Sequence, residues 1–138
     1  MNTTTKAMTM VAAGALATLT VAATVPASAH ATRHTLTMTS KQLQDRIVGG
    51  VDVATDKDIQ HGAVTGYDVT SCRIDTRTHL AHCDVAVARS NGVLLGRVSV
   101  HLNTGRGNGT VLGGTRAFHG ATGTISVALP RVTIVWNN

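Results

Sequence analysis

Apolar and polar residues alternate in several short runs after residue 30, and glycine, asparagine or proline bounds each run. Alternation over about four to eight residues is the pattern of a half-buried strand, and the bounding residues favour turns. The clearest runs lie at 35–39, 94–102, 124–129 and 131–136. The segment 42–58 is more charged and is expected to form a looser strand or a connection. The pattern predicts an all-β domain of about eight short strands, as in sandwiches and barrels.

The start of the chain has the features of an export signal. Lys6 precedes an apolar, uncharged run over 8–25, and Ala27-Ser28-Ala29 follows it with the small-residue spacing of a cleavage site. A second site of the same kind lies two residues later. We therefore expect residues 1–29 to be a signal peptide and residues 30–138 to be one secreted domain, with no membrane span after cleavage.

Two cysteines, Cys72 and Cys83, are present in the chain. In an exported protein such a pair is expected to be oxidised. If 62–72 and 79–89 form a hairpin centred near Arg77-Thr78, the two cysteines lie directly opposite each other. Cysteines at such a position can be bridged, so the sequence predicts a disulfide-linked hairpin.

The same register pairs Asp68 with Val87 and Thr70 with Val85, on a face that is mostly apolar and is therefore taken as the inward one. Asp68 is the polar exception on it. Burial among apolar groups raises the pKa of a carboxyl and suits it to act as a general acid or base. The competing interpretation is an aspartate bonded to a neighbour or to solvent. Asp68 is the first catalytic candidate.

His61 and His119 are further catalytic candidates because histidine exchanges protons near neutral pH, unless both are solvated loop residues. The inward apolar positions taken as ligand contacts are Val64, Val85 and Val87. Tyr67 is a further ligand-binding candidate. Alternation points it away from Asp68, so it reaches the same lumen only through a bulge and otherwise lies on the outer face or a subunit interface.

Two glycine-containing segments have a characteristic spacing. The first, 61–68, combines Gly62, Gly66 and a tyrosine; the second, 109–123, joins a Val-Leu-Gly-Gly-Thr turn to Phe118. They resemble the dirigent and allene oxide cyclase-like β-barrels, in which a Gly-Gly-Thr-Gly turn leads to a phenylalanine, a small residue and a glycine. The resemblance covers roughly residues 60–128.

The resemblance implies an eight-stranded antiparallel barrel whose lumen takes a lipophilic small molecule, with Phe118 as an anchor and ligand contact. It also implies cyclisation or coupling chemistry without a cofactor, and a homodimer or homotrimer. Three positions depart from the dirigent pattern. Arg116 replaces the last glycine of the turn, and His119 and Thr122 stand where dirigents have arginines.

Composition narrows the classes of function. The net charge is +5, and the basic residues are scattered singly. Tyr67, Phe118 and Trp136 are the aromatic residues of the chain. A nucleic-acid surface combines a basic stripe with a reading element, so no nucleic-acid partner is expected. His79 and His82 would point to opposite faces of a strand, so no metal site is expected either.

The sequence thus favours a secreted barrel that binds a lipophilic small molecule and steers its cyclisation or isomerisation. Two alternatives stay open. One is a carrier with the same lumen and no chemistry, and the other is a structural or interaction protein of the cell exterior whose barrel is filled by side chains. One fold hosts many functions, so the fold does not choose among them.

Overall fold

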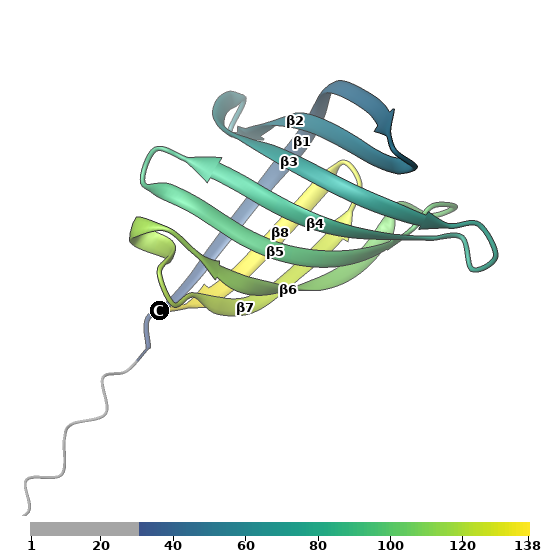
Figure 1. Ribbon diagram of the computed structural model, residues 1–138. Coiled ribbons are helices and arrows are strands. Elements are labelled where there is room, and N and C mark those ends of the chain that lie inside the picture. Colours follow the sequence, from purple (N-terminus) through teal and green to yellow (C-terminus); the bar gives the residue numbers. More distant parts are fainter. Residues whose placement is uncertain (1–30) are drawn as a thin grey trace, which may run out of the picture.

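The computed structural model describes residues 31–138, which form a closed antiparallel barrel of eight strands (Figure 1). Each strand pairs with the next, and β8 closes the barrel against β1. The strands are β1 (Arg33–Val48), β2 (Val51–Gln60), β3 (Ala63–Asp75), β4 (Leu80–Arg89), β5 (Gly92–His101), β6 (Arg106–Gly114), β7 (Thr122–Ala128) and β8 (Arg131–Asn137), with a 3-10 helix, η1 (Arg116–Phe118), after β6. The predicted all-β, eight-stranded antiparallel barrel is confirmed.

The expected signal peptide, residues 1–29, lies outside the described residues. Between residues 31 and 138, no helix has the length and apolarity needed to cross a membrane.

Alternation along each strand sends one set of side chains into the barrel and the other into solvent. In β5, Leu94 and Val98 are buried, whereas Leu95 and Arg97 between them are exposed. The buried apolar side chains form one cluster, made of Leu36, Met38, Ala81, Cys83, Val87, Leu94, Val98, Val111, Phe118, Ala121, Ile125, Val127 and Ile134. Alternating apolar positions therefore supply the core, as the sequence pattern predicts.

The 3-10 helix η1 packs at one end of the barrel, against β5 and β6. Phe118 is 3% exposed, and its ring meets Trp136 of β8 edge-on at a centroid distance of 5.5 Å. The backbone of η1 is fixed by hydrogen bonds from Ala117 to Asn91 and from Thr115 to Val93. Phe118 thus anchors η1 at this end of the barrel.

The hairpin of β3 and β4 has the predicted register. Cys72 lies opposite Cys83, with 4.0 Å between their Cα atoms, and the two form the disulfide. Asp68 is paired with Val87 and Thr70 with Val85. The disulfide-linked hairpin is confirmed, and its inward face carries Asp68 as expected.

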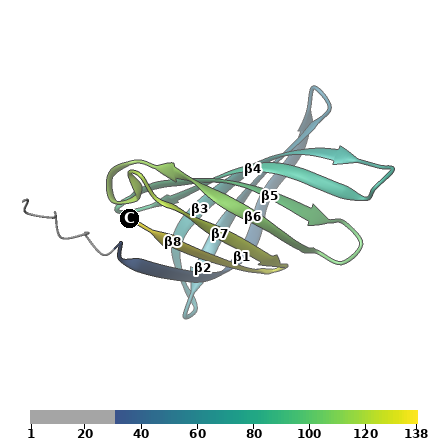
Figure 2. The same cartoon turned by 90° about the horizontal axis from the view of Figure 1, so that it is seen from below.

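The segment 42–58, which the sequence pattern did not settle, completes β1 and forms most of β2. The pairing of β1 with β8 ends at Thr39, while its pairing with β2 continues to Val48. The far half of the β1–β2 hairpin therefore runs past the β7–β8 turn and stands out from the barrel (Figure 2). A bulge at Leu43 interrupts the register there, and such bulges bend and twist an edge strand.

Candidate functional site

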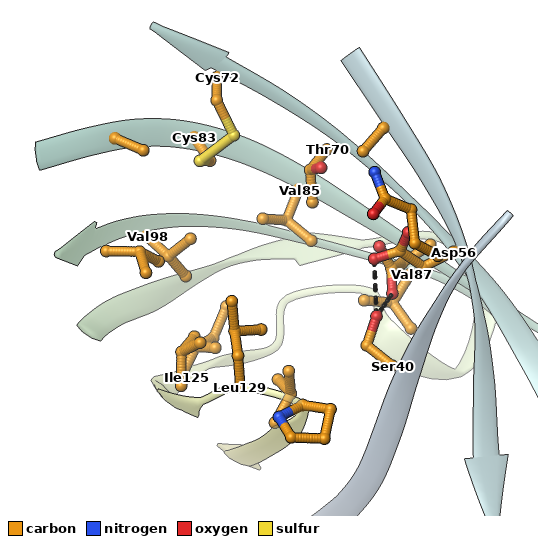
Figure 3. Close-up of a pocket in the computed structure, with 18 of the residues that line it drawn as sticks. Ser40, Asp56, Thr70, Cys72, Cys83, Val85, Val87, Val98, Ile125 and Leu129 are labelled. Carbon is orange, nitrogen blue, oxygen red and sulfur yellow. Dashed lines mark hydrogen bonds between the residues drawn. A yellow bond between two sulfur atoms is a disulfide. The ribbon is translucent and has the colours of Figure 1, made fainter. Parts of the chain in front are cut away.

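A cavity of about 390 Å³ lies inside the barrel (Figure 3). This volume falls within the range of about 300–1,000 Å³ that is usual for small-molecule sites. Much of the wall is apolar and comes from β4, β5, β7 and β8: Ala81, Val85, Val87, Val98, Val100, Ile125, Val127, Val132 and Ile134. The disulfide, Leu102, Leu129 and Pro130 also line the cavity. The barrel therefore holds space for a small apolar molecule.

The opposite wall is acidic, because β2 carries aspartates at alternate positions. Asp52 and Asp56 line the cavity with Ala54 between them, and Asp58 follows two residues further along the same face. Asp68 comes from β3, where it lies directly opposite Asp56 in the strand register. Asp56 and Asp58 of β2 thus lie next to Asp68 of β3.

Ser40 of β1 is the hydroxyl donor of this cluster. Its Oγ donates to Oδ2 of Asp56 at 2.7 Å and approaches Oδ2 of Asp68 at 3.5 Å (Figure 3). The strong bond orients the Asp56 carboxyl, and the longer contact leaves the Asp68 carboxyl weakly held. Asp68 is 4% exposed and still contributes to the cavity wall.

Asp58 is fully buried, and neither of its carboxyl oxygens has a conventional donor. Gly66 makes room for it, since a Cβ at Gly66 would lie 3.2 Å from Oδ2 of Asp58 and 2.6 Å from the carbonyl oxygen of Ala88. A protonated neighbour can supply the missing donor, because a carboxylic acid donates through its O–H.

Burial, the neighbouring Asp58 carboxyl and the charge of Asp56 together raise the pKa of Asp68 to about 8. Burial also raises the pKa of Asp58, whereas the neighbouring Asp68 and Arg89 lower it. The raised pKa of Asp68 favours its protonated, neutral form at pH 7.

Arg89 lies beside the cluster on the side away from the cavity. Its guanidinium donates to Oγ1 of Thr65 at 3.0 Å and to Oε1 of Gln60 at 2.7 Å. It does not contribute to the cavity wall. The Arg89 guanidinium thus favours the ionised form of Asp58 from the side away from the cavity, and it does not neutralise the carboxyls that face the lumen.

The structure brings together only part of the predicted site. Asp68, Val85 and Val87 line the cavity, and so do the cysteines of the disulfide. Val64 is 48% exposed and Tyr67 is 53% exposed, with Tyr67 on the outer face that alternation predicts for it. His61 lies in the exposed turn between β2 and β3, and His119 is exposed after η1. Phe118 is buried beside Trp136 and is not a wall residue of the cavity.

Sequence reasoning missed Ser40, Asp52, Asp56 and Asp58. The available signal was the even spacing of the three aspartates, which puts them on one face of a strand. The described part of the chain contains no group of three or more His, Cys, Asp or Glu side chains arranged to hold a metal ion.

The fold and cavity define a closed eight-stranded antiparallel barrel with a partly acidic lumen of ligand size. Comparison with solved structures finds similar folds, among them one named pyocyanin demethylase, at a TM-score of 0.61 and 19% sequence identity. The match covers 75% of this chain and 98% of that chain. Neither the protein-family models nor the curated proteins give a match. The similarity is one of fold, and it agrees with the barrel that the dirigent resemblance implies.

Proposed function

We propose that this protein binds a lipophilic small molecule in the barrel lumen and catalyses its isomerisation or cyclisation by proton transfer, without a cofactor. One observation carries the proposal: Asp68 lines a cavity of ligand size and adjoins Asp56 and Asp58, and burial raises its pKa to about 8. Pairs of carboxyls with separated protonation states are a common arrangement for acid and base catalysis.

In such a reaction the acidic wall both donates a proton to the substrate and accepts one from it. Asp68 gives its proton to one atom of the bound molecule, while a proton leaves another atom to the carboxylates of the cluster. The electron pairs of the substrate shift between these two atoms, so a double bond moves or a ring closes. The substrate is neither oxidised nor reduced, and the cluster ends with the same number of protons.

The apolar wall has a separate role in this proposal. It takes up the body of the substrate, excludes water and fixes its orientation against Asp68. The open cavity favours a ligand over the alternative of a barrel filled by side chains. The neighbour named as a demethylase of pyocyanin supports a small molecule as the substrate, and the dirigent resemblance supports cyclisation.

We further propose that the protein acts outside the cell after removal of residues 1–29. The intact Cys72–Cys83 disulfide is compatible with an extracellular location. The signal-like composition of the N-terminal segment supports export.

The test is a mass-spectrometric assay of the purified protein with a lipophilic extract of its source organism. We expect one compound to be converted into a product of identical mass, at least ~100-fold more slowly with Asp68→Asn. The matched control is Asp84→Asn, since Asp84 lies on the outside of β4 in an exposed ion pair with Arg97. Retention of a compound without conversion would identify a carrier. The absence of both binding and conversion would refute a small-molecule function.

A further inference from the structure

The acidic wall is unusual for a protein of this composition. The chain has 12 lysines and arginines against seven acidic residues. Four of those acidic residues nevertheless gather on the inward side of β2 and β3: Asp52, Asp56, Asp58 and Asp68. Within residues 31–138, no lysine, arginine or histidine is part of the cavity wall. The lumen is therefore acidic inside a basic protein.

Two carboxyl oxygens of this wall are buried without a hydrogen-bond partner. They are one Oδ atom each of Asp52 and Asp56. Leaving a buried carboxyl oxygen without a donor is unfavourable. Ser40 supplies one strong hydrogen bond, to Asp56, and Arg89 is engaged by Thr65 and Gln60. A ligand that brings hydrogen-bond donors or a positive charge would satisfy these oxygens.

The rest of the lumen specifies the body of the ligand. Opposite the carboxyls, the wall from β5, β7 and β8 is aliphatic, with Val98, Val100, Ile125 and Val132 among its residues. The described residues lack an arrangement that would hold a metal ion. An organic cation, with an apolar body and one charged end, fits both walls.

We propose that the lumen selects lipophilic organic cations, such as protonated amines, and holds the charged end against Asp56 and Asp68. This inference rests on the proposed function, because it names the substrate class for the same cavity. The carboxyls attract the charge, while the aliphatic wall gains by burying the body. An anionic or neutral analogue of such a ligand would lack the electrostatic attraction to the carboxyls.

Three probes with the same ring system test the proposal: 1-naphthylmethylamine, 1-naphthalenemethanol and 1-naphthoic acid. Isothermal titration of the purified protein at pH 7 would measure each affinity. We expect the amine to bind at least ~10-fold more tightly than the alcohol and the acid to bind most weakly.

Two variants complete the test. Asp56→Asn should reduce the advantage of the amine over the alcohol to within ~3-fold, with the affinity for the alcohol nearly unchanged, which also shows that the barrel is folded. Asp84→Asn, on the outer face, should leave all three affinities unchanged. Equal binding of amine and alcohol, or tightest binding of the acid, would overturn the cation proposal and leave ligand binding in the lumen intact. Failure of all three probes to bind would overturn both.

Discussion

Asp68 shows how much one buried carboxyl changes the behaviour of this barrel. The ordinary pKa of the group is 3.8, and in the folded chain it is about 8. The folded state therefore holds a proton that the unfolded state has already lost across this interval. Because the native state binds more protons, this contribution to the free energy of unfolding decreases as pH rises between these two values and is lost above about pH 8.

Asp68→Asn should remove that dependence, because an amide resembles the protonated acid and does not titrate. We expect the wild-type free energy of unfolding to decline by up to about 1.4 kcal/mol per pH unit through this group. The decline of the variant between about pH 5 and about pH 8 should be shallower. Urea denaturation at several pH values measures both curves.

Asp84→Asn is the control for this prediction, because Asp84 is exposed and surface ion pairs contribute little to stability. It should follow the wild-type slope. Parallel curves for wild type and Asp68→Asn would contradict the raised pKa of Asp68.

At the scale of the strands, close approach of neighbouring backbones depends on glycine. A Cβ at Gly109 of β6 would meet the carbonyl oxygen of Arg97 and would lie 2.8 Å from Cα of Val98 in β5. No flexible side chain can move to relieve this contact with the carbonyl oxygen. Glycine at this position allows β5 and β6 to curve together around the barrel.

Gly109→Ala is therefore expected to lower the free energy of unfolding by about 2–3 kcal/mol, since β5 and β6 must separate. Thr110→Ala, one residue further along on the exposed side, should cost less than about 1 kcal/mol. Urea denaturation of both variants gives the comparison. Similar losses for the two would show that the backbone contact at Gly109 is not what limits the fold.

The strands also show where sequence reasoning succeeds and where it fails. The register of β3 and β4 was predictable because Cys72 and Cys83 lie at equal distances from the turn. The inward face of β2 was not predictable, because the pattern of this strand is inverted. Asp52 and Asp56 face the lumen, while Val53, between them in the chain, lies on the other face. Alternation is interpreted on the assumption that apolar residues point inward, and a strand that carries a polar site violates it.

The inverted pattern of β2 also explains why sequence reasoning missed Asp56 and Asp58. Asp68 was found because its neighbours on the inward face are apolar, so that one acid stood out. Asp56 and Asp58 gave no such contrast, and no rule of local sequence pairs Asp56 with Asp68 across strands. His61 and His119 are near the relevant motifs in the chain, but they lie in exposed turns outside the cavity wall, which a local motif does not reveal.

At the scale of the whole molecule, the proposed function depends on the lumen remaining open. Val85 lines the cavity from β4 and is only partly buried, so a larger side chain there has space to enter. Val85→Phe should fill part of the cavity and weaken binding of 1-naphthylmethylamine by at least ~10-fold. The expected change in the free energy of unfolding is within about 1–2 kcal/mol.

Val69→Phe provides the matched control, because Val69 is 45% exposed on the outside of β3. It adds the same side chain to the neighbouring strand and should leave the affinity unchanged. Titration of both variants with the amine makes the comparison. An unchanged affinity in Val85→Phe would place the binding site outside the lumen.

The half of β1 that pairs only with β2 has a kinetic consequence for the barrel. Residues 41–48 bond to β2 on one side, whereas the other side passes beyond the end of β8. Segments that are hydrogen-bonded on one side open by local fluctuation at a lower free energy than strands held on both. Gln42 and Asp52, which line the cavity, belong to this hairpin. A ligand bound in the lumen is therefore expected to dissociate at a rate set by local opening of the β1–β2 hairpin. The disulfide-linked strands β3 and β4 stay folded during this opening.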